Sequence, residues 1–276
     1  MDIIQTSLGK IEYRLEGTGK KIALLIYGGH TNASTRLGED YFLERGYRIL
    51  AISRPGYGQT PLNTGPTPDT FADALSEMLK GLGVPKVLVV GISAGGRTAI
   101  RFAARHANLT DKLILQSSIS FAPYPGILTR LGTYIGFNGV TEKYTWKFLH
   151  YLLKKNPRAF FRMMIGNLTT LDPNRIVDAF SEKQLQELTS LFANMSSGRG
   201  FLNDIKTVKN DATDVTVPTL IIHSKYDGNV LLSHPRLLAK QIQGSKLYLS
   251  EAESHLLWFS PHYAEIKKVM DDFLHT

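Results

Sequence analysis

The stretch Gly91-Ile92-Ser93-Ala94-Gly95-Gly96 decides which fold this chain can adopt. The apolar, β-branched run Lys86-Val87-Leu88-Val89-Val90 precedes it and predicts a buried strand, whereas residues 97–104 after it are typical of a helix. In a G-x-S-x-G turn between a strand and a helix, the serine occupies a strained position that exposes its hydroxyl. Glycine two residues before and after the serine allows such a tight path. We therefore expect Ser93 to be a nucleophile; a plain strand-to-helix turn is the alternative.

Strand and helix patterns alternate on both sides of this turn, after a hairpin predicted over residues 2–6 and 10–15. Such alternation predicts an α/β fold with a mostly parallel central sheet and helices on both faces. The predicted strands cover residues 22–26, 47–53, 86–90, 112–116, 218–224 and 246–249, and the predicted helices cover 34–45, 68–82, 97–104, 235–243 and 261–274.

The alternation stops between Phe121 and Thr213, where helical patterns occur without strands. We therefore expect residues 1–120 and 213–276 to form the catalytic core and residues 121–212 to form an inserted all-helical cap. At least some apolar residues of the cap should line a pocket over Ser93, which would favour an uncharged acyl group. An inward-pointing arginine would instead make an anionic substrate plausible. The apolar stripes of the cap contain Tyr144, Phe148, Tyr151, Phe160, Met164, Phe192 and Met195.

The composition excludes several classes of protein. The 276 residues include no cysteine, so disulfides, thiolate metal sites and cysteine nucleophiles are excluded. No apolar stretch reaches the roughly 18 residues of a membrane span, and the N-terminus has no secretory signal pattern. The net charge of +8 comes from dispersed basic residues. We expect a cytoplasmic protein that uses no cofactor and no metal and that binds neither nucleic acid nor a membrane; its oligomeric state is left open.

A serine nucleophile needs a general base, and that base needs a carboxylate to orient it. Asp227 follows the strand predicted at 218–224, and His255 follows the last predicted strand. Because functional groups gather at the carboxyl ends of parallel strands, we expect both beside Ser93. The chain order Ser93, Asp227, His255 is the order of this type of triad. Asp211 and Asp214 are weaker alternatives for the acid.

An oxyanion hole is predicted from two further segments. The amide of Ala94 directly follows the nucleophile, which is the usual place for one donor. Gly28 and Gly29 follow a buried strand and allow a sharp turn with free amides. We expect the amide of Gly29 to be the second donor, with His30 as its alternative; an ordinary Gly-Gly loop would have no such role.

Together these motifs resemble the α/β-hydrolase fold superfamily, and in particular its serine-nucleophile members with a helical cap. The resemblance covers the catalytic core, about two thirds of the chain, and includes Arg54-Pro55-Gly56-Tyr57-Gly58 and Asp227-Gly228-Asn229-Val230. Tyr27-Gly28 stands where many relatives have His-Gly, and Ala94 stands where proline iminopeptidases have Trp. Relatives with an aspartate nucleophile, such as haloalkane dehalogenases and epoxide hydrolases, are disfavoured by Ser93.

The leading hypothesis is a cofactor-independent serine hydrolase that cleaves esters or related small acyl compounds through an acyl-enzyme. A carbon–carbon bond hydrolase with the same triad is one alternative. A non-catalytic member of the fold that binds a ligand or serves as a scaffold is another, because fold alone does not define function.

Overall fold

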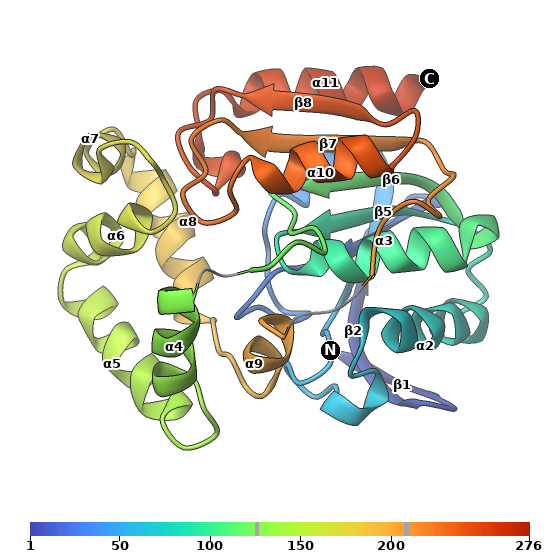
Figure 1. Cartoon of the computed structure of the whole chain (residues 1–276), viewed down its shortest axis with the longest axis horizontal. Helices are drawn as coiled ribbons and strands as arrows, with labels where there is room; N and C mark the ends of the chain where they lie inside the picture. The colour runs from blue at the N-terminus through green and yellow to red at the C-terminus, as the bar shows by residue number, and fades with distance from the viewer. Residues whose placement is uncertain (125–126, 207–209) are drawn as a thin grey trace.

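An eight-stranded sheet occupies the centre of the computed structural model (Figure 1). The structure describes residues 1–124, 127–206 and 210–276, and of residues 127–131 it describes the backbone alone. The strand order is β1-β2-β4-β3-β5-β6-β7-β8. The strands are β1 (Asp2–Thr6), β2 (Gly9–Glu16), β3 (Lys21–Ile26), β4 (Tyr47–Ile52), β5 (Val87–Ile92), β6 (Thr110–Gln116), β7 (Thr219–Ser224) and β8 (Lys246–Ser250).

The sheet is mostly parallel. β1 pairs with β2 and β2 with β4 in antiparallel register, whereas every later pairing is parallel. β5 lies between β3 and β6, and all of its side chains are buried, as expected for a strand covered on both faces. The predicted fold class is confirmed, and the carboxyl end of β5 places Ser93 at the edge where the parallel strands end.

Helices cover both faces of the sheet. Side chains of β5 alternate between two cores: Val87 and Val89 pack with α2 (Pro68–Gly81), α3 (Gly95–Arg105) and α10 (Ser233–Gln241). Leu88, Val90 and Ile92 belong to the opposite core, which includes residues of α1 (Asp40–Leu43) and α11 (Tyr263–His275). Short 3₁₀ turns occur at η1 (Leu62–Thr64), η2 (Ala107–Leu109) and η3 (Leu257–Phe259).

Among the described residues, six helices lie between β6 and β7, and most of them are on the left of Figure 1. They are α4 (Ile127–Gly136), α5 (Glu142–Lys155), α6 (Pro157–Gly166), α7 (Pro173–Asp178), α8 (Glu182–Ala193) and α9 (Gly200–Asp204). The edge-to-face rings of Phe160, Phe161 and Phe192 join α6 to α8. An all-helical insertion is therefore present. Its predicted bounds, 121 and 212, stay a prediction, and residues 125–126 and 207–209 of that range lie outside the described residues.

The prediction of a helix over residues 34–45 is wrong, because only α1 is helical in this range. Asn32 holds the chain in a local turn: its side chain accepts the amide of Ser34 at 2.8 Å, and its carbonyl accepts the amide of Thr35 at 3.0 Å. Such side-chain bonds compete with helix formation. Gly38, at φ +69°, then turns the chain into the left-handed region. The predicted helices at 235–243 and 261–274 exist with bounds shifted by one or two residues.

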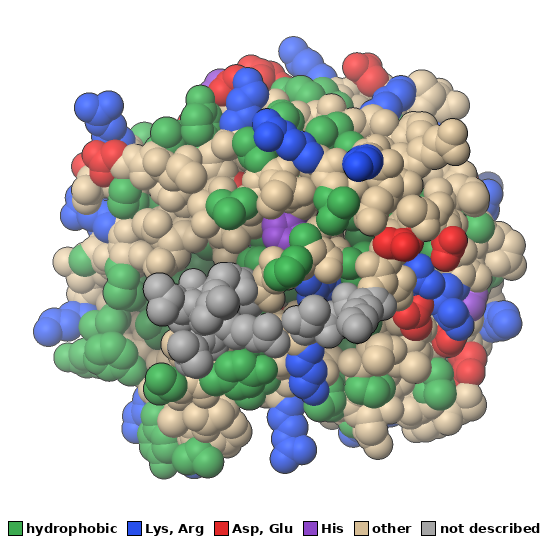
Figure 2. Space-filling view, in the orientation of Figure 1, with side chains coloured by type: hydrophobic (Ala, Val, Ile, Leu, Met, Phe, Trp, Pro, Cys, Tyr) green, Lys and Arg blue, Asp and Glu red, His purple; other side chains and the backbone are tan. Residues whose placement is uncertain are grey.

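Among the described residues, no helix is long and apolar enough to cross a membrane. On the face drawn in Figure 2, Lys and Arg side chains are scattered among other side chains. Several basic side chains of the protein have carboxylate partners, such as Arg105 with Asp73 and Arg158 with Glu182. This distribution agrees with the prediction of dispersed basic residues.

Candidate active site

Ser93 occupies the tight turn between β5 and α3 with φ at 50°, in the left-handed region that is rare for residues other than glycine. The amide of Ser93 donates to the carbonyl of Gln116 at 3.0 Å, which ties the turn to β6. Glycines lie next to Ser93 at positions where no larger residue fits. A Cβ at Gly28 would lie 2.8 Å from the Cβ of Ser93, and one at Gly95 would lie 2.0 Å from the carbonyl oxygen of Ile26.

His255 and Asp227 meet beside this turn. His255 Nδ1 is 2.6 Å from Asp227 Oδ2, and both residues are buried. The other carboxylate oxygen accepts the amides of Asn229 at 2.9 Å and Val230 at 2.8 Å, which fixes the acid. An ionised acid requires a proton on Nδ1, so Nε2 is left as the acceptor that a base needs. Within the described part of the chain, neither His255 Nε2 nor the Ser93 hydroxyl has a hydrogen-bond partner, and no hydrogen bond joins the two groups.

The alternative acids lie elsewhere. Asp211 accepts the amide and hydroxyl of Thr213 in a turn, and Asp214 is 3.7 Å from Arg101.

Sequence reasoning missed a second histidine behind the acid. His223 Nε2 donates to the carbonyl of Val230 at 2.7 Å and lies 3.3 Å from Asp227 Oδ2. Burial lowers its pKa, so this imidazole stays neutral beside the carboxylate.

A segment of the helical insertion, Leu168–Thr170, connects the loops of the acid and the base; we call it the clamp segment. The carbonyl of Leu168 accepts the amide of His255 at 2.8 Å and the amide of Gly228 at 3.3 Å. The amide of Thr170 donates to the carbonyl of Tyr226 at 2.9 Å, and the Thr169 hydroxyl donates to the carbonyl of Glu253. The position of both loops therefore depends on the insertion, a role that the sequence did not indicate.

Ser93, Ala94, Gly29, His30 and His255 line one cavity of about 230 Å³. Met164, Phe192 and Met195 line it from the insertion, which confirms the prediction that at least some apolar residues of the cap line this pocket. Phe160 is buried among other aromatic rings and lies outside the lining.

Tyr144, Phe148 and Tyr151 also lie outside the lining, and they are 61%, 59% and 58% exposed. All three belong to α5, which carries apolar residues on two faces. The opposite face turns Trp146 and Leu149 into the cavity. The helical period alone could not tell which of these faces points inward.

The backbone amides of Ala94 and Gly29, which line the cavity, have no hydrogen-bond partner among the described residues. The amide of His30, the alternative donor, interacts with the Tyr57 hydroxyl. This arrangement favours Gly29 over His30 as the second backbone donor.

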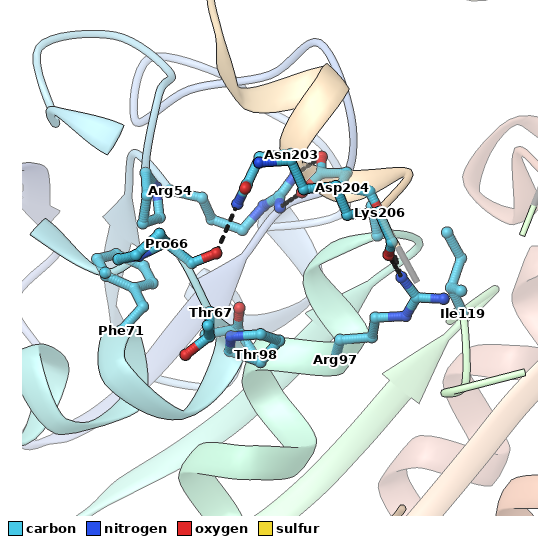
Figure 3. Close-up of a pocket in the computed structure, with 14 residues that line it drawn as sticks. Arg54, Pro66, Thr67, Phe71, Arg97, Thr98, Ile119, Asn203, Asp204 and Lys206 are labelled. Carbon is cyan, nitrogen blue, oxygen red and sulfur yellow. Dashed lines mark hydrogen bonds and ion pairs between the residues drawn. The ribbon is translucent and has the colours of Figure 1, made fainter. Parts of the chain in front are cut away.

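A buried ion pair forms the wall between this cavity and a second one of about 420 Å³, since Ala94 and Asp204 line both. Arg54 pairs with Asp204, which also accepts the Tyr57 hydroxyl at 2.6 Å. Arg97 donates to the carbonyls of Ser120 at 2.8 Å and Asp204 at 3.0 Å. Figure 3 shows both arginine side chains reaching toward the segment around Asp204. Of the described residues that line the cavity at Ser93, none is Lys or Arg, and the only carboxylate, Asp204, is paired.

Comparison with known proteins agrees with this geometry. A family model described as the alpha/beta hydrolase fold matches residues 24–260, so the chain belongs to the alpha/beta-hydrolase fold family. This membership confirms the predicted family and agrees with the prediction of a hydrolase.

Among relatives, the "Uncharacterized hydrolase YcgS" of Bacillus subtilis strain 168 is 32% identical over 274 residues, with 97% of this chain and 96% of the relative covered. A 2-hydroxy-6-oxononadienedioate/2-hydroxy-6-oxononatrienedioate hydrolase of a Pseudomonas species is 24% identical over 270 residues, with 93% and 87% covered. Among solved structures, an alpha/beta hydrolase fold protein from Nakamurella multipartita has a TM-score of 0.81 at 23% identity, with 99% and 98% covered. The enol-lactonase from Burkholderia xenovorans LB400 has a TM-score of 0.74 at 18% identity, with both chains covered completely (100%).

Proposed function

We propose that this protein is a cofactor-independent serine hydrolase that cleaves esters or related small, uncharged acyl compounds. The observation that carries the proposal is the 2.6 Å hydrogen bond between His255 Nδ1 and Asp227 Oδ2 at the cavity that Ser93 lines. Nucleophile, base and acid come from the ends of β5, β8 and β7, where parallel sheets collect reactive groups.

In this mechanism the Ser93 hydroxyl attacks the substrate carbonyl while His255 Nε2 takes its proton. Asp227 stabilises the imidazolium that forms. The amides of Ala94 and Gly29 donate to the oxyanion, and His255 then protonates the leaving group as the acyl-enzyme forms. Water, activated by the same imidazole, attacks the acyl-enzyme and releases the carboxylic acid and free Ser93.

The charge of the cavity supports an uncharged acyl group. A carboxylate in the substrate would find no free cation among the described lining residues and would lie near Asp204. Desolvating an unpaired charge costs far more than the ~0.8 kcal/mol that each buried methylene contributes. Comparing kcat/KM for a neutral ester and its matched carboxylated analogue tests this point; a preference of more than about tenfold for the anion would refute it.

Carbon–carbon bond hydrolysis is the second candidate, because the relative from Pseudomonas named above carries that type of activity in its name and aligns over 93% of this chain. The two candidates differ in substrate and share the nucleophile. A panel containing acyl esters and a vinylogous diketone would separate them, since only a carbon–carbon hydrolase adds water across the bond next to one ketone of the diketone, which yields a carboxylic acid and a fragment that retains the other ketone.

The decisive experiment is covalent labelling with a fluorophosphonate followed by peptide mass spectrometry. We expect one adduct, on Ser93, together with hydrolysis of short para-nitrophenyl esters. Ser93→Ala should abolish labelling and reduce kcat by about 10³ to 10⁶. A folded wild-type protein that neither labels nor turns over any substrate of the panel would favour a binding or scaffold role. A cytoplasmic location and the lack of a nucleic-acid or membrane partner stay predictions.

A further inference from the structure

His30 occupies an unusual place on the wall of the catalytic cavity. Its backbone is in the left-handed region at φ 63°, directly after the proposed oxyanion donor Gly29. Its ring lies 3.8 Å from the ring centroid of Phe201, 5.0 Å from Phe137 and 5.3 Å from Trp146. A polar ring is therefore held inside an aromatic cluster, where every unpaired polar atom is unfavourable.

A chain of hydrogen bonds determines which ring nitrogen carries the proton. The indole Nε1 of Trp146 can only donate, and it lies 2.7 Å from the Ser197 hydroxyl. The same hydroxyl is 2.7 Å from His30 Nδ1. Among the described residues, the hydroxyl has no acceptor other than Nδ1, so it donates its own hydrogen there. This network assigns the proton of the neutral ring to Nε2.

The Nε2–H group is free to bind a ligand. It has no hydrogen-bond partner in the described part of the chain. Several unpaired polar side-chain atoms are inaccessible to solvent, but His30 Nε2 is not one of them. Since His30 lines the cavity, we infer that the cavity is the space open to this group. Burial lowers the pKa of His30 to about 4, so near neutral pH the ring is an uncharged donor.

We propose that His30 Nε2–H binds a second oxygen of the substrate, so that the preferred substrates are uncharged acyl compounds with an ether or ketone oxygen besides the scissile carbonyl. This inference rests on the proposed serine-hydrolase function and adds a substrate class to it. The amides of Ala94 and Gly29 already supply two donors for the oxyanion, whereas the His30 ring is tied to Trp146 and Ser197 of the helical insertion. The ring therefore serves the part of the substrate that lies beneath the insertion.

The kinetic test uses para-nitrophenyl hexanoate and analogues in which an ether oxygen replaces one chain methylene at successive positions, or a ketone is added there. A site that hydrogen-bonds a substrate oxygen discriminates against the analogue that lacks it. We expect wild type to prefer one oxygen-bearing ester by at least about tenfold in kcat/KM, and His30→Phe to lose this preference, so that kcat/KM falls at least about tenfold more for that ester than for the plain hexanoate.

Two variants cover the case in which His30→Phe does not fold. His30→Asn retains an N–H donor on a residue type that tolerates the left-handed region, and it should keep part of the preference. Ser197→Ala keeps His30 but removes the hydrogen bond that fixes its tautomer, and it should weaken the preference. Equal losses on plain and oxygen-bearing esters in these variants would contradict the inference and would indicate a role at the scissile carbonyl.

The tautomer has a test that does not require turnover. Long-range ¹H–¹⁵N correlation of histidine-labelled Ser93→Ala protein should show His30 protonated at Nε2 and not at Nδ1. Protonation at Nδ1 would overturn the inference. If wild type fails to react with the fluorophosphonate, the proposed function fails; if it reacts but shows no preference for oxygen-bearing esters, only the role of His30 fails.

Discussion

Gly228 lies so close to Thr169 that a Cβ atom at position 228 would be 2.5 Å from the carbonyl oxygen of Thr169. Thr169 also forms an isolated antiparallel bridge with Asp227, the residue before Gly228. One residue belongs to the turn of the acid and the other to the clamp segment. The missing side chain of Gly228 therefore allows the helical insertion to reach the acid and base loops together.

Gly228→Ala should separate the clamp segment from these loops. We expect kcat to fall by about tenfold to a hundredfold with KM within about threefold, because small displacements of catalytic groups reduce the rate strongly. Steady-state kinetics on a para-nitrophenyl ester measures the effect. Gly139→Ala is the matched control, since a Cβ there meets no atom within 4 Å. Equal kinetics in both variants would show that the contact does not position the site.

Asp227→Asn should reduce kcat by about 10⁴, because an amide can donate to His255 and stabilise the wrong tautomer. Asp211→Asn is the matched control, since among the described residues the Asp211 carboxylate accepts hydrogen bonds only from Thr213 of its own turn. Stopped-flow measurement of the acylation burst would follow the effect on Ser93 directly. Normal acylation in Asp227→Asn would mean that another carboxylate is the acid.

Asp204→Asn should destabilise the fold by about 3–5 kcal/mol, because it leaves the buried Arg54 guanidinium without a counter-charge. Asp178→Asn removes the partner of Arg162 at an exposed pair and should change the free energy of unfolding by less than about 1 kcal/mol. Urea denaturation of both variants measures the difference. If the two losses are equal, the buried pair contributes no more than the surface pair.

Stability should fall as the pH decreases from about 6.5 toward 4. Burial, and for His234 also the nearby Arg97, lowers the pKa values of His30 and His234 from 6.5 to about 4. In this range the unfolded chain binds a proton at each histidine and the folded chain does not, so stability is retained above pH 6.5 and lost below it. Each contributes a slope of about 1.4 kcal/mol per pH unit. Urea denaturation across this range gives the free energy of unfolding as a function of pH. In His234→Gln the slope of this curve should be smaller than in wild type by the contribution of about one proton. Equal slopes in the two proteins would refute the prediction.

Met164→Ala should shift the preferred acyl chain toward longer substrates, because truncating a lining side chain enlarges the cavity. Met163→Ala on the same helix should leave the profile unchanged, since Met163 is 46% exposed and lies outside the lining. The measurement is kcat/KM across a series of para-nitrophenyl esters. An identical shift in both variants would place the acyl group elsewhere.

The sequence was sufficient where local pattern and chemistry coincide. The strand, turn and helix around Ser93 can be read from apolar runs and glycines, and the order of Asp227 and His255 follows from the ends of the strands. The sequence was insufficient where the structure depends on which surfaces of the chain pack against each other. The outward face of α5, with Phe148, and the turn at Asn32 that replaces a helix both depend on contacts or local bonds that periodicity does not encode. The link from Leu168 to His255 uses a backbone carbonyl, which every residue type has.

The pairing of Arg54 with Asp204 limits how this enzyme could exchange parts with its relatives. Arg54 follows β4 of the sheet, whereas Asp204 belongs to α9 of the helical insertion. A chimera that received a foreign insertion without an acid at this place would bury a guanidinium with no counter-charge, and one that also lacked the clamp segment would leave the His255 amide without its acceptor. New specificity in this scaffold is therefore more accessible through point changes at the cavity wall than through replacement of the whole insertion.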